Sequence, residues 1–299
     1  MAYPGFLKKI AMCTPVLSDV LVERDRLRGE ISFAGEKLNM IQAAVTSSSV
    51  KLDLTYKKIE AMEAAVKSVE RRGYCHCCRQ ETDFEILGDW LRDQYLCVNC
   101  SSIPRQRHIQ YVMDKYFSGW GLGSIHESSP SNDFISRYCE RYSSSQYFEG
   151  VKFGELVGGV RCENLEALTF NDDSFDLFIT QDVFEHIFNP ELAAKEIMRV
   201  LKPGGAHIFT APKHKHVSLS YPRARLAGAN IEYMVEPEYH GNPIGDGRAL
   251  VTWDYGDDFE SLIGRWSDSS TTTYLTRDRL LGLDGEYLEV FVIRKAAVG

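Results

Sequence analysis

The segment from residue 175 to residue 210 constrains the fold of this 299-residue chain more than any other. Residues 175–180 are a short apolar run of the kind that forms a buried parallel strand. A helix is expected at about 190–201, where the apolar residues fall on one face, and a Lys-Pro-Gly-Gly turn ends it. Residues 206–210 predict the next strand. A strand, a helix and a strand with short connections predict a right-handed parallel crossover, and therefore an α/β fold.

Polar residues follow the strands of this predicted sheet. Asp182 and His186 come after the first strand of the crossover, and His214 comes after the second. Two earlier runs, 122–126 and 146–148, predict strands that end at Glu127 and Glu149, and a last strand is expected at 287–293. Because ligands of open parallel sheets bind at the carboxyl ends of the strands, the candidate site lies at this edge.

The N-terminal quarter of the chain has a different pattern. From residue 17 to residue 69 a 3-4 spacing continues without a slip, and thirteen of its sixteen seam positions are apolar. This spacing predicts a long helix with a coiled-coil seam. The polar seam residues are Arg24, Ser48 and Thr55, and a polar patch lies at 46–49. Two interpretations remain open: an intermolecular coiled coil, or an antiparallel hairpin that turns at this patch.

Four cysteines form two Cys-x-x-Cys pairs, Cys75 with Cys78 and Cys97 with Cys100. Each pair brings two thiolates together from a tight turn, and four thiolates are the ligands that tetrahedral structural zinc prefers. Because four protein ligands leave no position for water, the sequence predicts a structural zinc knot. Cys77 and His76 lie inside the first pair and are alternative ligands.

The charge and composition exclude some classes of protein. The formal net charge is −8, which argues against a dedicated nucleic-acid binder, because phosphate contacts need concentrated Lys and Arg. No apolar run approaches the roughly 20 residues of a membrane span, and no signal peptide is evident. With its cysteines in metal-binding pairs, the chain is expected to be cytoplasmic.

One run of about 45 residues, Leu168–Pro212, carries a family resemblance. Its pieces SFD, EH, RVLKPGG and TAP stand in the order and spacing of the fourth strand, helix and fifth strand of class I S-adenosylmethionine-dependent methyltransferases, which it resembles (type 11-like). The resemblance implies a Rossmann-like sheet with helices on both faces. Together with the other patterns it predicts three regions: a helical or coiled-coil segment (1–72), a four-cysteine zinc knot (73–107) and a methyltransferase-like α/β domain (108–299).

The resemblance also implies S-adenosylmethionine as the cofactor. Glu149 matches the carboxylate that binds the ribose, and Asn164 stands where the family has an acid that contacts the adenine. The residues implied in cofactor binding are Glu127, Ser128, Ser129, Glu149, Asn164, Leu165, Asp182 and Val183. The family has glycines after its first strand, whereas residues 128–132 contain none. We expect serine hydroxyls and the start of a helix near Asp133 to hold the amino acid end instead.

Methyl transfer is an in-line displacement in which the cofactor supplies the activation and the protein aligns the nucleophile. A hydroxyl acceptor also needs a base, for which His186 is the first candidate, because imidazole titrates near neutrality. His240 and His214 are alternatives, and a purely structural role for His186 is equally consistent with the sequence. The polar loop 239–247 is expected to cover the substrate.

The sequence therefore predicts a methyltransferase that acts at an oxygen of a small molecule or a glycan and forms homo-oligomers through its N-terminal helix. One alternative is a catalytically inactive methyltransferase-like scaffold whose zinc knot and coiled coil bind a partner protein. The glycine-free loop after the first strand favours this alternative. A third interpretation is a pocket for another nucleotide, such as a nucleotide sugar.

Overall fold

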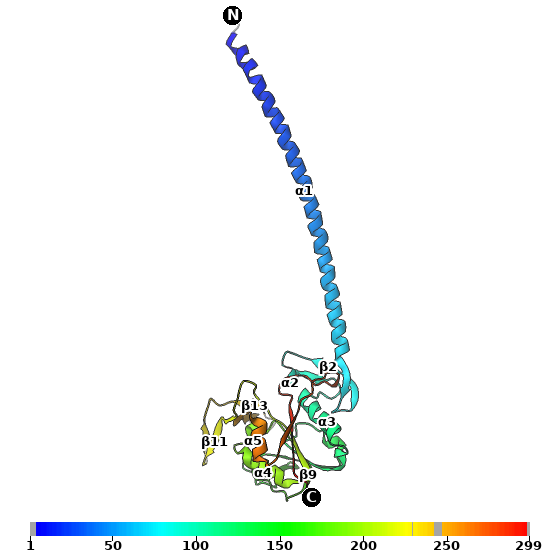
Figure 1. Cartoon of the computed structure of the whole chain (residues 1–299), viewed down its shortest axis with the longest axis vertical. Coiled ribbons are helices and arrows are strands. Elements are labelled where there is room, and N and C mark those ends of the chain that lie inside the picture. Colours follow the sequence, from blue (N-terminus) through cyan, green and yellow to red (C-terminus); the bar gives the residue numbers. More distant parts are fainter. Residues whose placement is uncertain (1–3, 229, 242–246, 298–299) are drawn as a thin grey trace. The chain divides into compact units, whose positions relative to one another are not determined.

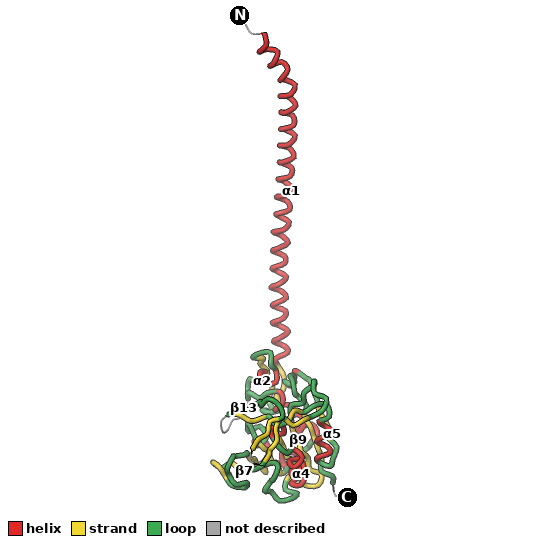
Figure 2. The backbone as a smooth tube through the Cα atoms, turned by 90° about the vertical axis from the view of Figure 1, so that its left-hand side faces the viewer, coloured by secondary structure: helices red, strands yellow, loops and turns green. Residues whose placement is uncertain are grey.

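The computed structural model describes residues 4–228, 230–241 and 247–297; side chains are described from residue 19 onward, except those of residues 61 and 63–71. The chain divides into two compact units, Met1–Ser68 and Val69–Gly299. Figures 1 and 2 show both units. None of the described helices combines the length and the apolarity needed to cross a membrane.

The described residues of the first unit form one helix. Helix α1 spans Pro4–Arg71 and is continuous through the polar patch at 46–49. Within that patch the Thr46 hydroxyl donates to the Gln42 carbonyl oxygen at 2.9 Å, so it bonds back to the helix and does not start a turn. The antiparallel hairpin is therefore wrong. The side chains of residues 19–60 are all exposed, and the coiled coil stays a prediction.

The cysteine-rich segment forms a small antiparallel sheet at the start of the second unit. Its strands are β1 (Arg72–Cys75), β2 (Gln80–Ile86) and β3 (Tyr95–Cys97), with β2 in the middle and the short helix α2 (Leu91–Gln94) before β3. Each Cys-x-x-Cys turn begins at the last residue of an outer strand. This arrangement brings the two turns to the same end of the sheet, because β1 and β3 both pair antiparallel to β2.

An eight-stranded sheet forms the centre of the second unit. In sheet order its strands are β16 (Thr271–Tyr274), β17 (Val290–Arg294), β9 (Leu201–Thr210), β8 (Phe175–Gln181), β4 (Ser124–Ser128), β5 (Arg141–Gln146), β7 (Val160–Cys162) and β6 (Leu156–Val157). Strands β9, β8, β4, β5 and β7 are parallel, and β17 runs antiparallel to β9. The parallel crossover predicted from the sequence is confirmed by the pairing of β8 with β9 through helix α4 (Pro190–Val200).

Helices cover both faces of this sheet, as predicted. Alternate residues of β8 belong to two hydrophobic cores: Phe178 packs with helices α4 and α5 (Phe259–Trp266), whereas Ile179 packs with helix α3 (Pro104–Tyr116). Helices α4 and α5 contact each other (Figures 1 and 2). Ile197 of α4 is fully buried in the first core, where truncation of such a side chain to alanine costs about 2–5 kcal/mol.

Short two-stranded sheets follow β9 along the chain. They are β10 (Tyr221–Pro222) with β15 (Trp253–Asp254), β11 (Ala224–Ala227) with β12 (Asn230–Tyr233), and β13 (Tyr239–Gly241) with β14 (Arg248–Leu250). The last pair flanks the loop that was expected to cover the substrate. Residues 242–246 of that loop lie outside the described residues.

Two expectations about the first half of the sheet are wrong. The second strand was expected at 146–148 but ends at Gln146, so Glu149 lies in a turn beyond it. No α-helix begins near Asp133: the described connection from β4 to β5 contains only the 3₁₀ turn η2 (Ser136–Tyr138). The Ser-Ser-Pro-Ser-Asn run favours turns, and the Asn132 side chain accepts a hydrogen bond from the Phe134 backbone at 3.0 Å.

Candidate functional site

Three of the residues predicted to bind the cofactor lie at the carboxyl ends of neighbouring strands. Strands β8, β4, β5 and β7 are neighbours and parallel, so their carboxyl ends share this edge. Glu127 is the residue before the last in β4, Asp182 directly follows β8, and Asn164 lies two residues beyond β7. Their roles in cofactor binding stay predictions.

Glu127 is enclosed by protein. Its side chain is fully buried, and its two oxygens accept hydrogen bonds from the Tyr142 hydroxyl and the Gln181 amide, both at 2.8 Å. Burial raises the pKa of Glu127 to about 7, although both hydrogen bonds oppose this shift. The next two residues differ from each other, because Ser128 is buried and Ser129 is half-buried.

The ends of β5 and β7 carry the residues implied in adenosine binding. Glu149 is exposed. The Asn164 carboxamide oxygen accepts the Glu166 backbone N–H at 2.9 Å, and Leu165 is buried in the core beside α4. Glu163, the acid nearest to Asn164, is bonded to Arg161 and Thr169. These bonds make Glu163 part of the internal structure of this loop.

Asp182 forms ion pairs with two arginines. The sequence did not predict these partners. Arg92 of α2 pairs with its carboxylate, and Arg105 of α3 lies 3.2 Å from the same oxygen. The Thr210 hydroxyl donates to the other oxygen at 2.8 Å. Burial alone would raise the pKa of Asp182, but the two guanidinium groups outweigh burial and lower it. Val183, the next residue, is half-buried against the α4 core.

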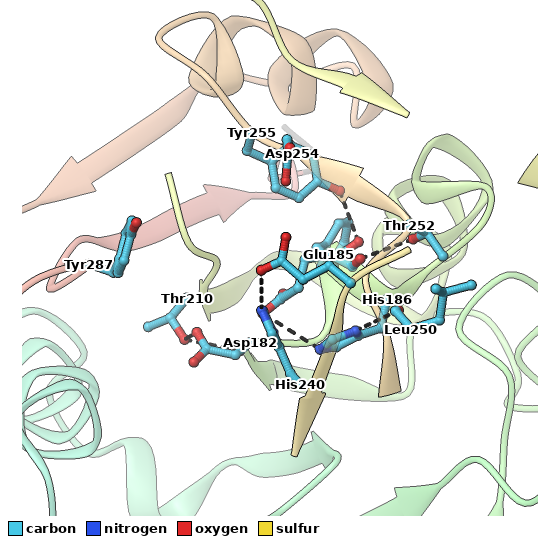
Figure 3. A network of polar contacts seen from close by, with 12 residues as sticks. Asp182, Glu185, His186, Thr210, His240, Leu250, Thr252, Asp254, Tyr255 and Tyr287 are labelled. Carbon is cyan, nitrogen blue, oxygen red and sulfur yellow. Dashed lines mark hydrogen bonds and ion pairs between the residues drawn. The ribbon is translucent and has the colours of Figure 1, made fainter. Parts of the chain in front are cut away.

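The structure brings His186 and His240 together with Glu185 (Figure 3). His186 ends the 3₁₀ turn η3 (Phe184–His186) and donates from Nδ1 to the Leu250 carbonyl oxygen at 2.8 Å. Burial lowers the pKa of His186, so its Nε2 carries a lone pair at neutral pH. His240 lies on β13, with its ring edge-on to that of His186 at 5.1 Å.

The sequence predicts no more for Glu185 than an orienting role beside His186. Its side chain is 1% exposed, and neither carboxylate oxygen has a hydrogen-bond partner among the described residues. Burial, followed by the nearby charge of Asp182, raises the pKa of Glu185 well above its ordinary value. The backbone beneath it is fixed, because Thr252 donates from its N–H to the Glu185 carbonyl oxygen at 2.7 Å. The Tyr255 hydroxyl donates to the carbonyl oxygen of Phe184 at 2.9 Å.

His214, the third candidate base, has different neighbours. Its Nδ1 lies 3.1 Å from the Tyr287 hydroxyl and its Nε2 lies 3.7 Å from Asp254. It is not a member of the group formed by Glu185, His186 and His240.

The four predicted zinc ligands also converge. Their sulfur atoms all lie within 4.8 Å of one another, with 3.7 Å between Cys75 and Cys100 and 3.9 Å between Cys78 and Cys97. Four thiolates at about 2.3 Å from a tetrahedral ion would be about 3.8 Å apart, so the donor set fits zinc. Cys77 is not part of this group, and His76 bonds instead to Asp114 at 2.8 Å.

Comparison with known proteins finds a family that matches the region around this edge of the sheet. A family model described as a methyltransferase domain matches residues 119–209, the segment from the turn before β4 to the end of β9. Residues 119–209 are therefore similar to a methyltransferase domain. The matched segment includes Glu127, Asp182 and His186, whereas His240 and the four-cysteine group lie outside it.

The relatives of the methyltransferase domain are distant. The chain is 27% identical over 97 residues to an uncharacterized 37.1 kDa protein in a transposon of Streptomyces fradiae, which covers 32% of this chain and 28% of that protein. It is 24% identical over 131 residues to an uncharacterized methyltransferase of Schizosaccharomyces pombe, which covers 44% of this chain and 46% of that protein. The chain therefore matches less than half of the length of either relative.

Solved structures of methyltransferases are similar as well. An S-adenosylmethionine-dependent methyltransferase from Mesorhizobium loti is 13% identical and has a TM-score of 0.41, with 63% of this chain and 98% of that chain covered.

Proposed function

We propose that this chain transfers a methyl group from S-adenosylmethionine to an oxygen atom of a small molecule or a glycan. The observation that carries the proposal is the methyltransferase-domain match at 119–209, which includes the polar carboxyl ends of β4 and β8. The residues available to the cofactor are the exposed Glu149 and the half-buried Ser129 and Asn164. Glu149 would bind the ribose hydroxyls, and Asn164 and Leu165 would line the adenine side.

One orphaned atom supports a polar ligand at this edge. The Gln181 carboxamide oxygen is buried and has no hydrogen-bond partner among the described residues. Its amide nitrogen is fixed by donation to Glu127, so the free oxygen is an acceptor for a donor such as the cofactor's amino group. The cofactor supplies an activated methyl group, and the protein aligns the acceptor with it.

The proposal that the acceptor is a hydroxyl rests on the residues that follow β8, chiefly His186. A hydroxyl is a poor nucleophile until its proton is removed. His186 is neutral, its Nδ1–H is fixed by Leu250, and its Nε2 lone pair is free to accept a proton. We therefore assign acceptor activation to His186, with His240 beside it.

Calorimetry with S-adenosylhomocysteine and S-adenosylmethionine tests the proposal. One site per chain supports it, as does transfer of labelled methyl from S-adenosylmethionine to a member of a hydroxyl-compound or glycan panel. The absence of binding heat at high protein concentration overturns it. A thermal-shift panel of nucleotides distinguishes this outcome from binding of another nucleotide.

The proposal includes a structural zinc ion held by Cys75, Cys78, Cys97 and Cys100, and a cytoplasmic location in which these thiols stay reduced. Arg107 is fully buried near the sulfur atoms, where its charge offsets that of a four-thiolate site. Its guanidinium donates to the carbonyl oxygens of Ser102, Tyr95 and Gly282. Metal analysis of the purified protein tests this part: a folded chain without bound zinc removes it.

Homo-oligomerisation through α1 is also proposed. Seam residues such as Ile31 and Val45 are 71% and 62% exposed in the single chain, which leaves an apolar stripe for a second copy. Light scattering of the wild type and of Ile31→Glu tests it. A dimer that the substitution converts to a monomer supports the coiled coil, and a wild-type monomer at high concentration contradicts it.

The scaffold is the second candidate function. Glu127 is closed off by Tyr142 and Gln181, and Asp182 by Arg92 and Arg105, so two of the predicted cofactor ligands are already bonded to protein. A chain that binds neither form of the cofactor would fit this candidate.

A further inference from the structure

Glu185, His186 and His240 form what we call the Glu-His-His cluster. One carboxylate oxygen and one ring nitrogen from each histidine lie within 4.8 Å of one another. The carboxylate has no hydrogen-bond partner among the described residues, although its residue is 1% exposed. A buried carboxylate without a partner is unfavourable by several kcal/mol, so such groups are normally paired or bound to a metal ion.

The spacing of the cluster is not that of hydrogen bonds. His186 Nε2 lies 3.8 Å from Glu185 Oε1, and His240 Nδ1 lies 4.0 Å from the same oxygen. Hydrogen bonds between nitrogen and oxygen are about 2.7–3.2 Å long. Ligand atoms about 2.1 Å from a shared ion are about 3.0–3.5 Å apart, so Glu185 would have to approach each histidine by roughly half an ångström. The two ring nitrogens, which lie within 4.8 Å of each other, would also have to move closer together.

Both histidines are oriented for metal binding. His186 donates its Nδ1–H to the Leu250 carbonyl oxygen, and this hydrogen bond selects the tautomer whose Nε2 lone pair faces Glu185. On His240 the Nδ1 atom faces Glu185, while its Nε2 lies 3.8 Å from a carboxylate oxygen of Glu238. That distance is too long for a hydrogen bond, so only His186 has the fixed second partner that is typical of metal-bound histidine.

The neighbouring carboxylate is not a fourth ligand. The oxygens of Asp182 are bonded to Arg92, Arg105 and Thr210, and Asp182 is not in the cluster. The side chain of His240 is 39% exposed, so the cluster is accessible from that side. Three protein ligands with an accessible side leave coordination positions for water or a substrate.

We propose that the Glu-His-His cluster binds one divalent first-row transition-metal ion. Two imidazoles and one carboxylate suit Fe²⁺, Mn²⁺, Co²⁺ or Zn²⁺ with open positions, whereas a four-thiolate site selects zinc and leaves none open. The two metal sites therefore differ in ligand type and can be distinguished spectroscopically. Metal binding here does not depend on the proposed methyl transfer.

A consequence for the reaction does rest on the proposed function. A hydroxyl bound at an open position of the ion loses its proton more readily, because the ion stabilises the alkoxide. In the metal-bound form the ion would replace His186 as the group that activates the acceptor oxygen, because His186 Nε2 would be a ligand; the proton of the hydroxyl would leave to solvent on the accessible side.

Titration of the full-length protein with Mn²⁺ tests the proposal, because free Mn²⁺ has an electron paramagnetic resonance signal that disappears on binding. Mn²⁺ prefers oxygen and nitrogen ligands, so the thiolate site does not compete for it. We expect one bound ion per wild-type chain and at least a tenfold loss of affinity in Glu185→Gln and in His240→Ala. The exposed His216 provides the matched control, and His216→Ala is expected to bind like the wild type.

Stability measurements keep the test decisive if one variant folds poorly. His240 lies on the exposed β13–β14 pair, so its truncation is expected to be tolerated better than a change at Glu185. Mn²⁺ should raise the melting temperature of the wild type and not of His240→Ala. The proposal is overturned if the wild type binds neither Mn²⁺ nor Co²⁺ outside the thiolate site, or if His240→Ala binds them equally well. Mn²⁺ binding without S-adenosylhomocysteine binding would retain the metal site and remove the methyl transfer.

Discussion

Glu127 and Glu185 are both buried carboxylates near the carboxyl edge of the same sheet, yet their surroundings differ. Glu127, on β4, accepts hydrogen bonds from Tyr142 and Gln181. Glu185, beyond β8, has no hydrogen-bond partner in the described structure and faces His186 and His240. A carboxylate that the protein satisfies by itself contributes to the architecture, whereas one left unsatisfied among imidazoles points to a missing ligand.

The strongest test of this contrast is His186→Ala. If His186, which lies beyond β8, activates the acceptor, loss of its Nε2 lone pair should lower the rate of methyl transfer by about 100-fold to 10,000-fold. Binding of S-adenosylhomocysteine should change little, since the cofactor is proposed to lie nearer to β4, β5 and β7. Rates are measured with an acceptor found in the panel, and His216→Ala is the control. A rate within about threefold of the wild type would remove His186 from the chemistry.

Glu127→Gln should have the next largest effect, and on stability rather than on rate. Because burial raises the pKa of Glu127 to about 7 from 4.5, the folded state binds its proton more tightly than the unfolded state does. The wild type should therefore lose about 3 kcal/mol of stability as the pH rises from about 4.5 through about 7.

The glutamine variant should lose this part of the pH dependence, because it cannot ionise. Urea unfolding of both proteins at about pH 5 and about pH 8.5 measures the difference. Equal pH dependence in wild type and variant would show that Glu127 is not a buried, titrating carboxyl group.

Tyr142→Phe should have a smaller effect, which is also on the stability of the protein. It removes the hydroxyl that donates to Glu127, which leaves a buried carboxylate oxygen without a partner and destabilises the protein by about 1–3 kcal/mol near neutral pH. Tyr147→Phe is the matched control, because Tyr147 is 52% exposed. Thermal unfolding of the two variants decides the point, and an equal change in both would show that the Tyr142 hydroxyl contributes nothing specific.

Much of the fold could be predicted because its signals are local. The crossover from Phe175 to Thr210 combines a buried strand and an amphipathic helix within one short run, and the structure confirms both. The Lys-Pro-Gly-Gly run that was expected to form a turn lies instead within β9, which begins directly after the helix at Leu201. The connection after β4 could not be predicted as well, because the family resemblance suggested a helix where the Ser-Pro-Asn run forms turns. The polar patch at 46–49 was ambiguous for a similar reason, since Ser and Thr suit turns and also bond back to a helix.

The candidate site was only partly predictable. His186 and Asp182 could be placed at a strand end from their position after an apolar run. Spacing alone gave no reason to bring His240 to Glu185, because their contact depends on the β13–β14 pair. The partners of Asp182, Arg92 and Arg105, lie about 80 residues earlier in the chain, and no periodic pattern connects them.

A crystal structure of the full chain with S-adenosylhomocysteine tests the central claim most directly. We expect the adenosine beside Glu149 and Asn164, and the sulfur atom on the side of the Glu-His-His cluster. A crevice filled by the chain's own side chains, with the ligand absent at saturating concentration or bound elsewhere, would contradict the enzymatic account and favour the scaffold.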